Sequence, residues 1–306
     1  MAELRIHFFG GFQLLFDNLP LPDLPTQRAK ALFAMLALQA GQVLPRVRLM
    51  DVLWQEVDES HARKCLSTEL WRIRTLLKAG GLCPERLFVA SRDGVMFDSK
   101  APYWLDVEAF VRALATVKSV GPELLVPEQV RVLQEAVDLY RGDLLEGFYD
   151  DWCLLHREAL ASQYLRALEM LMRWHFAVGQ WEAAISCGQK LLAHDPLLEH
   201  VHRSIIRCYL ELGARSAAIR QYGSCVECLR KELGIEPMEE TIMLYGSICG
   251  AQGPPEIAAG SGMSAPLAGP AAPLDLALER LQRARRCLAQ ASRLLAQQAA
   301  RARHPT

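Results

Sequence analysis

Residues 60–81 concentrate side chains that can contact phosphates and nucleobases. At 100° per residue, one stripe of a helix here is apolar and contains Ala62, Leu66, Leu70, Ile73 and Leu77. The opposite face carries Lys64, Ser67, Thr68, Trp71, Thr75 and Lys78, with Arg72 and Arg74 on its flanks and Glu69 as its only acid. Cations and hydroxyls suit phosphate oxygens, and an arginine or an indole suits base edges. The segment is a candidate nucleic-acid-binding face, although a solvated basic helix surface would show the same pattern.

The ends of this segment carry helix-boundary signals. Ser60 can cap the N-terminus, because its side-chain oxygen can accept an unpaired backbone N–H. Gly80 and Gly81 can end the helix, since glycine tolerates the left-handed turn that closes one. Trp71 could instead belong to the core of the protein, but its position on the helical wheel favours exposure.

The neighbouring segments are typical of a winged helix-turn-helix. Residues 29–40 predict a nearly all-apolar helix, and residues 46–54 predict a short amphipathic one. Residues 87–90 and 95–97 are short apolar runs around an Asp-Gly pair, which predicts a hairpin because both turn residues can take positive φ. Arg92 at its tip could enter a minor groove or contact a phosphate. A helix in the major groove beside a basic hairpin is a known DNA-docking geometry.

The order of these segments resembles the OmpR/PhoB-type winged helix. The matching runs are LRIHFFGGFQLLF, RAKALFAMLAL, RLMDVLW and ARKCLSTELWRIRTLL, followed by the hairpin. The Gly10-Gly11 pair, LMDVLW and WLDVEAF resemble more narrowly the SARP-type activators (Streptomyces antibiotic regulatory proteins). Those proteins carry a winged helix followed by a bacterial transcriptional activation domain. One departure is Gly94-Val95 in the wing, where many relatives have Gly-Tyr.

Charge, position and the family's pattern together single out eight residues as candidate DNA contacts. They are Lys64 and Arg74 for phosphates, Ser67, Thr68, Trp71 and Arg72 for bases, and Arg63 and Arg92 for the backbone on either side. Arg72 is the residue best able to make a bidentate contact to guanine.

Charge is divided unevenly along the chain. The formal net charge is −1, yet residues 63–92 hold seven Lys and Arg against two Asp and Glu. Residues 101–250 hold 14 against 21, and residues 251–306 hold seven against three. DNA responds to the local patch, because charges farther than about 8 Å are largely screened. Such a modest patch predicts weak binding by one copy, with affinity gained from a second copy or a partner.

Size and cysteine use predict a cytoplasmic protein. The 306 residues suffice for two domains, and no apolar run approaches the ~18–20 residues that span a bilayer. The N-terminus lacks a basic region followed by a long apolar stretch, so no signal peptide is predicted. Nine cysteines are scattered without framework spacing, which favours a reducing compartment.

From residue 104 onward the pattern is almost wholly helical, beginning with a helix that Asp106 can cap and that should pack on the winged helix. Residues 179–185 recur as residues 213–219, displaced by 34 residues. That period, with Gly at the turn and Ala where helices cross, is typical of tetratricopeptide (TPR) repeats, whose helix pairs stack. Residues 195–203 and 230–237 resemble the SARP activation domain, so the resemblance covers about residues 3–250.

The tail differs in composition. Residues 251–273 are rich in Gly, Pro and Ala and predict a flexible linker. In residues 274–306, Leu recurs every seventh position from Leu274 to Leu295 among several arginines. This pattern predicts a basic helix that either pairs with another helix or docks on this chain's own helical domain.

No catalytic motif is present. The chain lacks a Gly-rich phosphate loop, a Gly-x-Ser-x-Gly elbow and a His-Glu-x-x-His pair. Cys225 and Cys228 have no second pair at zinc spacing, so buried thiols are favoured over a metal site. Neither an enzyme nor a cofactor or metal is predicted.

The sequence therefore predicts a mixed fold: an α+β winged helix-turn-helix (residues 1–100), an all-α TPR-like activation domain (101–250), the linker (251–273) and the basic helix (274–306). The predicted function is a sequence-specific regulator of transcription that binds double-stranded promoter DNA and does not associate with membranes. The resemblance implies an activator, a homodimer on DNA and contact with RNA polymerase. The alternatives are a ligand-sensing helical domain, or a protein-interaction adaptor whose winged helix no longer binds specific DNA.

Overall fold

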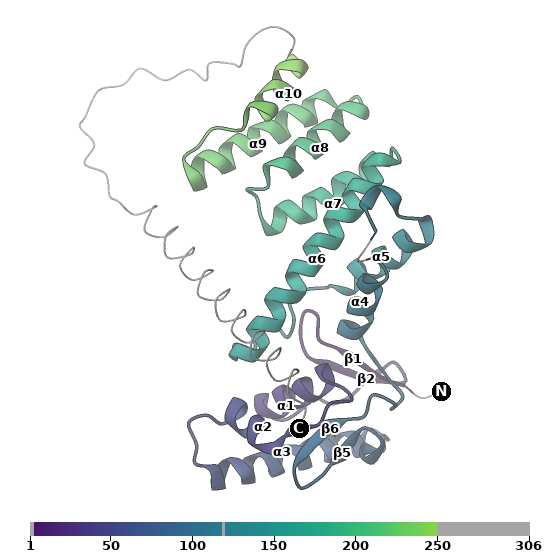
Figure 1. The fold of residues 1–306 in the computed structure, drawn as a ribbon, viewed down its shortest axis with the longest axis vertical. Helices are drawn as coiled ribbons and strands as arrows, with labels where there is room; N and C mark the ends of the chain where they lie inside the picture. Colours follow the sequence, from purple (N-terminus) through teal and green to yellow (C-terminus); the bar gives the residue numbers. More distant parts are fainter. Residues whose placement is uncertain (1–2, 118–119, 250–306) are drawn as a thin grey trace, which may run out of the picture. The chain divides into compact units, whose positions relative to one another are not determined.

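The structure, a computed structural model, describes residues 3–117 and 120–249 (Figure 1). The predicted linker at 251–273 and the predicted helix at 274–306 lie outside these ranges. Within them, a small α+β module is followed by a series of helices, which confirms the predicted fold class. No helix in this part of the chain is both long and apolar enough to cross a membrane.

The first module contains two small sheets. One has the order β3-β2-β1-β7 and consists of β1 (Leu4–His7), β2 (Gln13–Phe16), β3 (Leu19–Pro20) and β7 (Tyr103–Leu105). The other has the order β4-β6-β5 and consists of β4 (Leu44–Pro45), β5 (Phe88–Ala90) and β6 (Gly94–Phe97). β1 pairs antiparallel with β2 and parallel with β7, so that Leu4 lies opposite both Phe16 and Tyr103. The hairpin predicted from residues 87–90 and 95–97 is confirmed, because β5 pairs antiparallel with β6.

Three helices share one hydrophobic core with residues of both sheets. They are α1 (Gln27–Leu38), α2 (Arg46–Leu53) and α3 (Glu59–Ala79), followed by a short 3-10 turn at Pro84–Arg86. The apolar composition of α1 fits its position, since α1 contacts α2, α3 and β6. Phe33 of α1 meets the rings of Phe88 and Phe97 edge-on, at centroid distances of 5.8 and 5.9 Å. Such edge-to-face pairs stabilise aromatic cores, and here they join the central helix to the wing.

The N-terminus of α3 differs from the prediction. Asp58, not Ser60, caps the helix: its carboxylate accepts the backbone N–H of His61 at 3.1 Å. The Ser60 hydroxyl donates to the same carboxylate at 2.8 Å, and this bond helps to hold the pKa of Asp58 below its usual value. At the other end, Gly80 follows the last helical residue and Gly81 takes φ +83°, as its position predicts.

The helical part begins against the first sheet. α4 (Asp106–Ala115) follows β7 directly; after it come a 3-10 turn at Pro122–Leu124 and α5 (Pro127–Leu139). Phe110 of α4 meets the ring of Phe9 edge-on at 5.3 Å, and the two rings share one core with the winged helix. The expectation that this helix packs on the first module is confirmed. The predicted division at residues 100 and 101 stays a prediction, with residues 103–105 completing the sheet of the first module.

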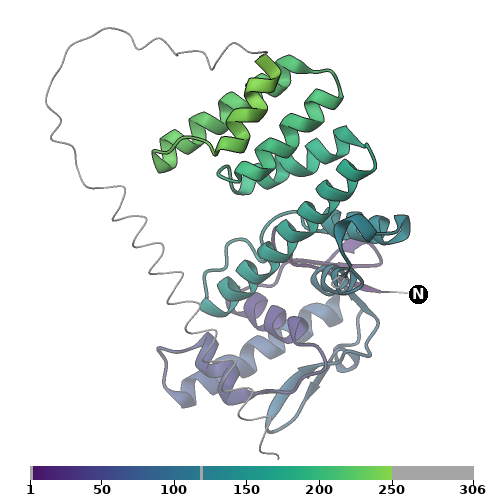
Figure 2. The ribbon, with the colours of Figure 1, turned by 45° about the horizontal axis from the view of Figure 1, so that its top comes forward.

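Five helices complete the described part of the chain, each packing chiefly on its neighbours in sequence (Figures 1 and 2). They are α6 (Asp151–Ala177), α7 (Trp181–His194), α8 (Glu199–Glu211), α9 (Arg215–Leu233) and α10 (Glu239–Cys249). Gly179 and Gly213, 34 positions apart, both take positive φ between consecutive helices. Leu171 and Ile205, separated by the same offset, are both fully buried. The predicted TPR-like repeat is therefore present.

Candidate nucleic-acid interface

α3 divides into a buried stripe and an exposed face, as its period predicts. The five apolar residues of the stripe, Ala62, Leu66, Leu70, Ile73 and Leu77, are buried. On the opposite face, Trp71 is 64% exposed. Because most of its surface is exposed, a core role for Trp71 is wrong. Its plane is available to a partner.

The eight candidate contacts are all accessible to different degrees. Arg63, Lys64, Ser67, Thr68, Trp71 and Arg92 are exposed, whereas Arg72 and Arg74 are half-buried on the flanks of α3. Four of them, Arg63, Lys64, Ser67 and Thr68, line one open hollow beside the first turns of α3. The structure therefore gathers the helical candidates along one face and places Arg92 separately on the wing.

The cations differ in how they are held. Arg63 pairs with Glu59 at 2.7 Å, and Arg72 pairs with Glu69 at 2.7 Å. Over residues 3–117 and 120–249, no ion pair involves Lys64, Arg74 or Arg92. These three cations can neutralise phosphates without first breaking a pair within the protein.

The hydroxyls of Ser67 and Thr68 are turned back to the helix. Ser67 donates to the carbonyl of Arg63 and Thr68 donates to that of Lys64, each at 2.9 Å. Side chains of this kind commonly bond the preceding turn of a helix. Because each proton is used internally, these oxygens offer lone pairs outward. In this geometry they can accept from a base amino group but cannot donate to a phosphate.

The wing turn is held by Ser91. Its hydroxyl accepts the backbone N–H groups of Asp93 and Gly94 at 3.3 and 3.1 Å. Neither Asp93 nor Gly94 takes positive φ, so the turn geometry expected for Asp-Gly is wrong although the hairpin is present. Gly94 is required for another reason: a Cβ there would lie 2.7 Å from the carbonyl oxygen of Leu44 on β4. The close crossing of two strands therefore explains this glycine.

Two neighbours of the candidate set were missed from the sequence. Arg46 starts α2, and its Nε donates to the carbonyl of Ser91 at 3.2 Å, which ties that helix to the wing turn. Glu69, expected on the exposed face, is buried and bonds Thr26 and Arg72. A signal for Glu69 existed, because it lies only about 20° from Ala62 on the helical wheel.

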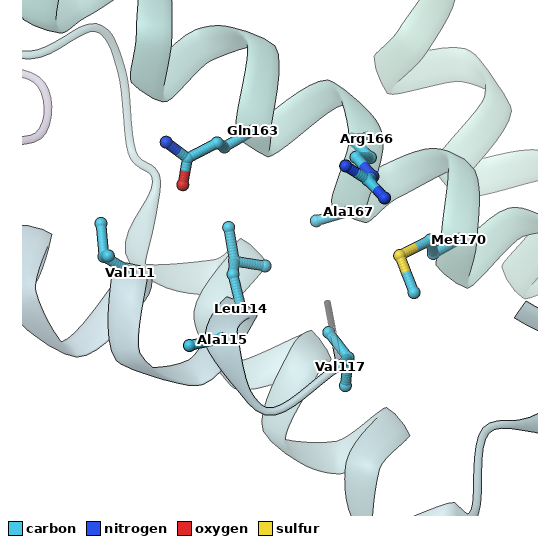
Figure 3. A pocket seen from close by; sticks show the side chains of 8 residues that line it. All are labelled: Val111, Leu114, Ala115, Val117, Gln163, Arg166, Ala167 and Met170. Carbon is cyan, nitrogen blue, oxygen red and sulfur yellow. The ribbon is translucent and has the colours of Figure 1, made fainter. Parts of the chain in front are cut away.

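A separate cavity of about 420 Å³ lies in the helical part (Figure 3). Val111, Leu114, Ala115 and Val117 form one wall, and Gln163, Arg166, Ala167 and Met170 of α6 form the other. The lining is mainly apolar, with one amide and one guanidinium group. This cavity has the composition of a small-molecule site, but it is remote in sequence from the candidate DNA contacts.

Two titratable groups of the repeat, His202 and Cys225, are buried in its core. His202 is buried, bonds the carbonyl of Pro196 at 3.0 Å and has its pKa lowered by burial. Burial raises the pKa of the Cys225 thiol to about 12, so the group remains a protonated, weakly polar core residue. Within the described ranges, no group of three or more His, Cys, Asp or Glu side chains could hold a metal ion.

Comparison with known proteins agrees with this architecture. Residues 105–249 match the family described as the bacterial transcriptional activator domain. The chain is similar to the transcriptional regulatory protein MoaR1 of Mycobacterium tuberculosis, with 26% identity over 81% of this chain and 79% of MoaR1. It is also similar to the regulatory protein DnrI of Streptomyces peucetius, with 26% identity over 69% of this chain and 79% of DnrI.

The fold also has a solved counterpart. The structure of Mycobacterium tuberculosis EmbR in complex with a low-affinity phosphopeptide superposes with a TM-score of 0.64 and 24% identity. The match covers 83% of this chain and 66% of that chain. Fold, activator domain and named relatives agree with the resemblance carried by the sequence motifs. Residues 105–249 are therefore a bacterial transcriptional activator domain, and the chain is similar to transcriptional regulators such as MoaR1 and DnrI.

Proposed function

We propose that the chain is a sequence-specific, DNA-binding activator that acts on promoter DNA in the cytoplasm. The observation that carries this proposal is the exposed face of α3, where Trp71 stands 64% exposed between the cations of the helix. Lys64 and Arg74 would bind phosphates and Arg72 would contact a guanine, while Arg92 on the wing reaches the backbone. A buried or neutral face at this position would not support the proposal.

Partners follow from the family rather than from the geometry. The description of the matched domain is that of a transcriptional activator, and we propose that residues 105–249 contact RNA polymerase. Two copies on repeated half-sites would compensate for the modest charge of one module, because counterion release grows with the number of phosphates contacted.

The decisive experiment is selection of duplexes from a random pool by the full chain, followed by titration against a scrambled duplex. We expect preferential binding to the selected duplex. Arg72→Ala combined with Arg74→Ala should abolish the preference. Equal affinity for every duplex at physiological salt would contradict the proposal.

An adaptor function remains the competing hypothesis. It predicts no shift of any duplex and stable capture of a protein partner. The test requires the full chain, because β7 and α4 share a core with the winged helix. A fragment starting at residue 101 would expose Phe110, whose ring lies against Phe9, and could capture proteins nonspecifically.

A further inference from the structure

Glu69 is a buried carboxylate on the helix that carries the candidate DNA contacts. It is 7% exposed, and both of its oxygens are engaged. Oε1 accepts a hydrogen bond from Nη1 of Arg72 at 2.7 Å, and Oε2 accepts one from the hydroxyl of Thr26 at 2.7 Å. Burying a charge is costly unless it is paired and hydrogen-bonded. The two bonds therefore fix this carboxylate in one position.

Thr26 connects the Glu69 carboxylate to a second helix, α1. Its hydroxyl oxygen accepts the backbone N–H of Ala29 at 3.0 Å and thereby caps α1. The hydroxyl proton goes to Glu69 and a lone pair goes to Ala29, so both neighbours set the orientation of Thr26. α1 and α3 pack side by side (Figures 1 and 2). Arg72 is thus linked through Glu69 to the first turn of α1.

This link changes what Arg72 can do. The Arg72 side chain is 36% exposed, and the bond to Glu69 uses one of its five N–H donors. Bidentate recognition of guanine needs two donors held in one plane. An unrestrained arginine can also turn to a phosphate, which carries no sequence information. A fixed carboxylate both orients the guanidinium plane and repels a phosphate from that side.

Resting on the DNA-binding function proposed above, we infer that Glu69 is a positioning residue that makes Arg72 a determinant of sequence specificity. Glu69 does not touch DNA in this proposal. Its carboxylate lowers affinity for DNA in general and raises the preference for the correct duplex. General affinity and sequence preference can be measured separately. Substitution of a purely structural residue would weaken binding to all duplexes alike.

The matched control lies on the same helix. Glu59 pairs with Arg63 at the same 2.7 Å, but both side chains are exposed and neither is anchored to another helix. Glu59→Gln and Glu69→Gln each remove one negative charge from α3. Both should slightly strengthen binding of the full chain to a scrambled duplex. Only Glu69→Gln should reduce the ratio of selected to scrambled affinity, by about tenfold, which is the lower range for one bidentate base contact.

Salt dependence and a conservative variant complete the test. For the Glu69→Gln variant and the scrambled duplex, the plot of log binding constant against log salt concentration should be steeper by about one unit. The reason is that Arg72 becomes free to bind a phosphate. Thr26→Ser keeps the hydroxyl and should keep the ratio. Arg72→Lys, which leaves the Thr26–Glu69 bond intact, should lower the ratio as Glu69→Gln does, since an ammonium group has no planar fork.

The outcomes are distinguishable. An unchanged ratio in Glu69→Gln or in Arg72→Lys overturns the inference, as does an equal loss in Glu59→Gln. If the wild-type chain itself shows no preference for any duplex, the proposed function fails and this inference fails with it. If the wild type shows the preference and Glu69→Gln keeps it in full, only the inference fails.

Discussion

The carboxylate of Asp106 accepts the backbone N–H of Phe8 at 2.8 Å, although the two residues lie 98 positions apart. The same oxygen accepts the N–H of Phe9 at 2.9 Å, and the other oxygen accepts that of Val107 at 2.7 Å. Asp106 is the first residue of α4, and the N-cap is Leu105 without a side-chain bond, so the expected cap by Asp106 is wrong. Its carboxylate instead binds the two N–H groups that follow β1. The winged helix and the activator domain share this junction.

Asp106→Asn should destabilise the chain in a pH-dependent way. Asp106 is 1% exposed, and burial raises its pKa to about 6 against the lowering effect of its three N–H donors. Its contribution to stability is therefore greatest at low pH and declines as pH rises through 6. The loss in unfolding free energy on mutation should be about 2 kcal/mol at pH 5 and smaller at pH 7.5. Urea titrations at both values measure it.

The experiment must account for a second titrating group, His7, and for the loss of one charge. His7 lies 3.9 Å from Asp106, and its pKa is lowered by burial, so it contributes in the opposite direction as pH falls. The difference between mutant and wild type must therefore be compared, not either curve alone. Asp17→Asn, in the exposed turn after β2, is the charge-matched control. A difference in unfolding free energy between wild type and Asp106→Asn that increases toward pH 7.5 would contradict the raised pKa of Asp106.

Contacts such as those of Asp106 could not be predicted from the sequence, whereas local periodic features could. Periodicity predicted the buried stripe of α3 and the exposure of Trp71, because a helix repeats within a few residues. The 34-residue offset predicted Gly179 and Gly213 at equivalent turns for the same local reason. The bonds from Asp106 to Phe8 and from Glu69 to Thr26 join residues far apart in the chain. No local pattern encodes such a contact, so only the fold reveals it.

Gly94→Ala should displace the wing. A Cβ at this position would lie 2.7 Å from the Leu44 carbonyl oxygen and 2.6 Å from a methyl carbon of Val43, and a backbone carbonyl within a sheet cannot easily move. We expect the free energy of unfolding to fall by about 1–3 kcal/mol, which is typical of overpacking. Thermal unfolding measures it, with Gly121→Ala in an open loop as the control. Equal melting temperatures for wild type and Gly94→Ala would show that β4 and β6 can separate.

Gly188→Ala and Gly223→Ala should have opposite effects. Both glycines lie inside helices of the repeat, where alanine is favoured by about 1 kcal/mol. A Cβ at residue 188 would lie 2.8 Å from Cγ1 of the fully buried Ile205, whereas nothing lies within 4 Å of one at residue 223. Gly223→Ala should raise the melting temperature and Gly188→Ala should lower it. A rise in both would contradict the close approach of α7 and α8.

Substitution of Arg157 should destabilise the protein far more than substitution of Arg166 on the same helix. Its guanidinium donates to the carbonyls of Leu144, Leu145 and Phe148 at 2.8–2.9 Å. Leu145 in turn donates to the carbonyl of Phe8 at 2.7 Å, so this loop lies against β1. Arg157→Lys keeps the charge but cannot reproduce the planar set of bonds. We expect the free energy of unfolding to fall by about 2–4 kcal/mol. Arg166→Lys on the exposed side of α6 is the control and should cost little.

The salt dependence of DNA binding should separate paired from unpaired cations. Lys64→Gln, Arg74→Gln and Arg92→Gln should each reduce the log–log salt slope by about one unit, since each lost phosphate contact releases one counterion fewer. Arg63 is already neutralised by Glu59 at 2.7 Å. Its substitution should therefore change the slope by less, because phosphate binding must first compete with that carboxylate. Equal slopes for all four variants would mean that the Glu59–Arg63 pair is absent in solution, since an exposed pair of this kind contributes only about 0.2–1 kcal/mol.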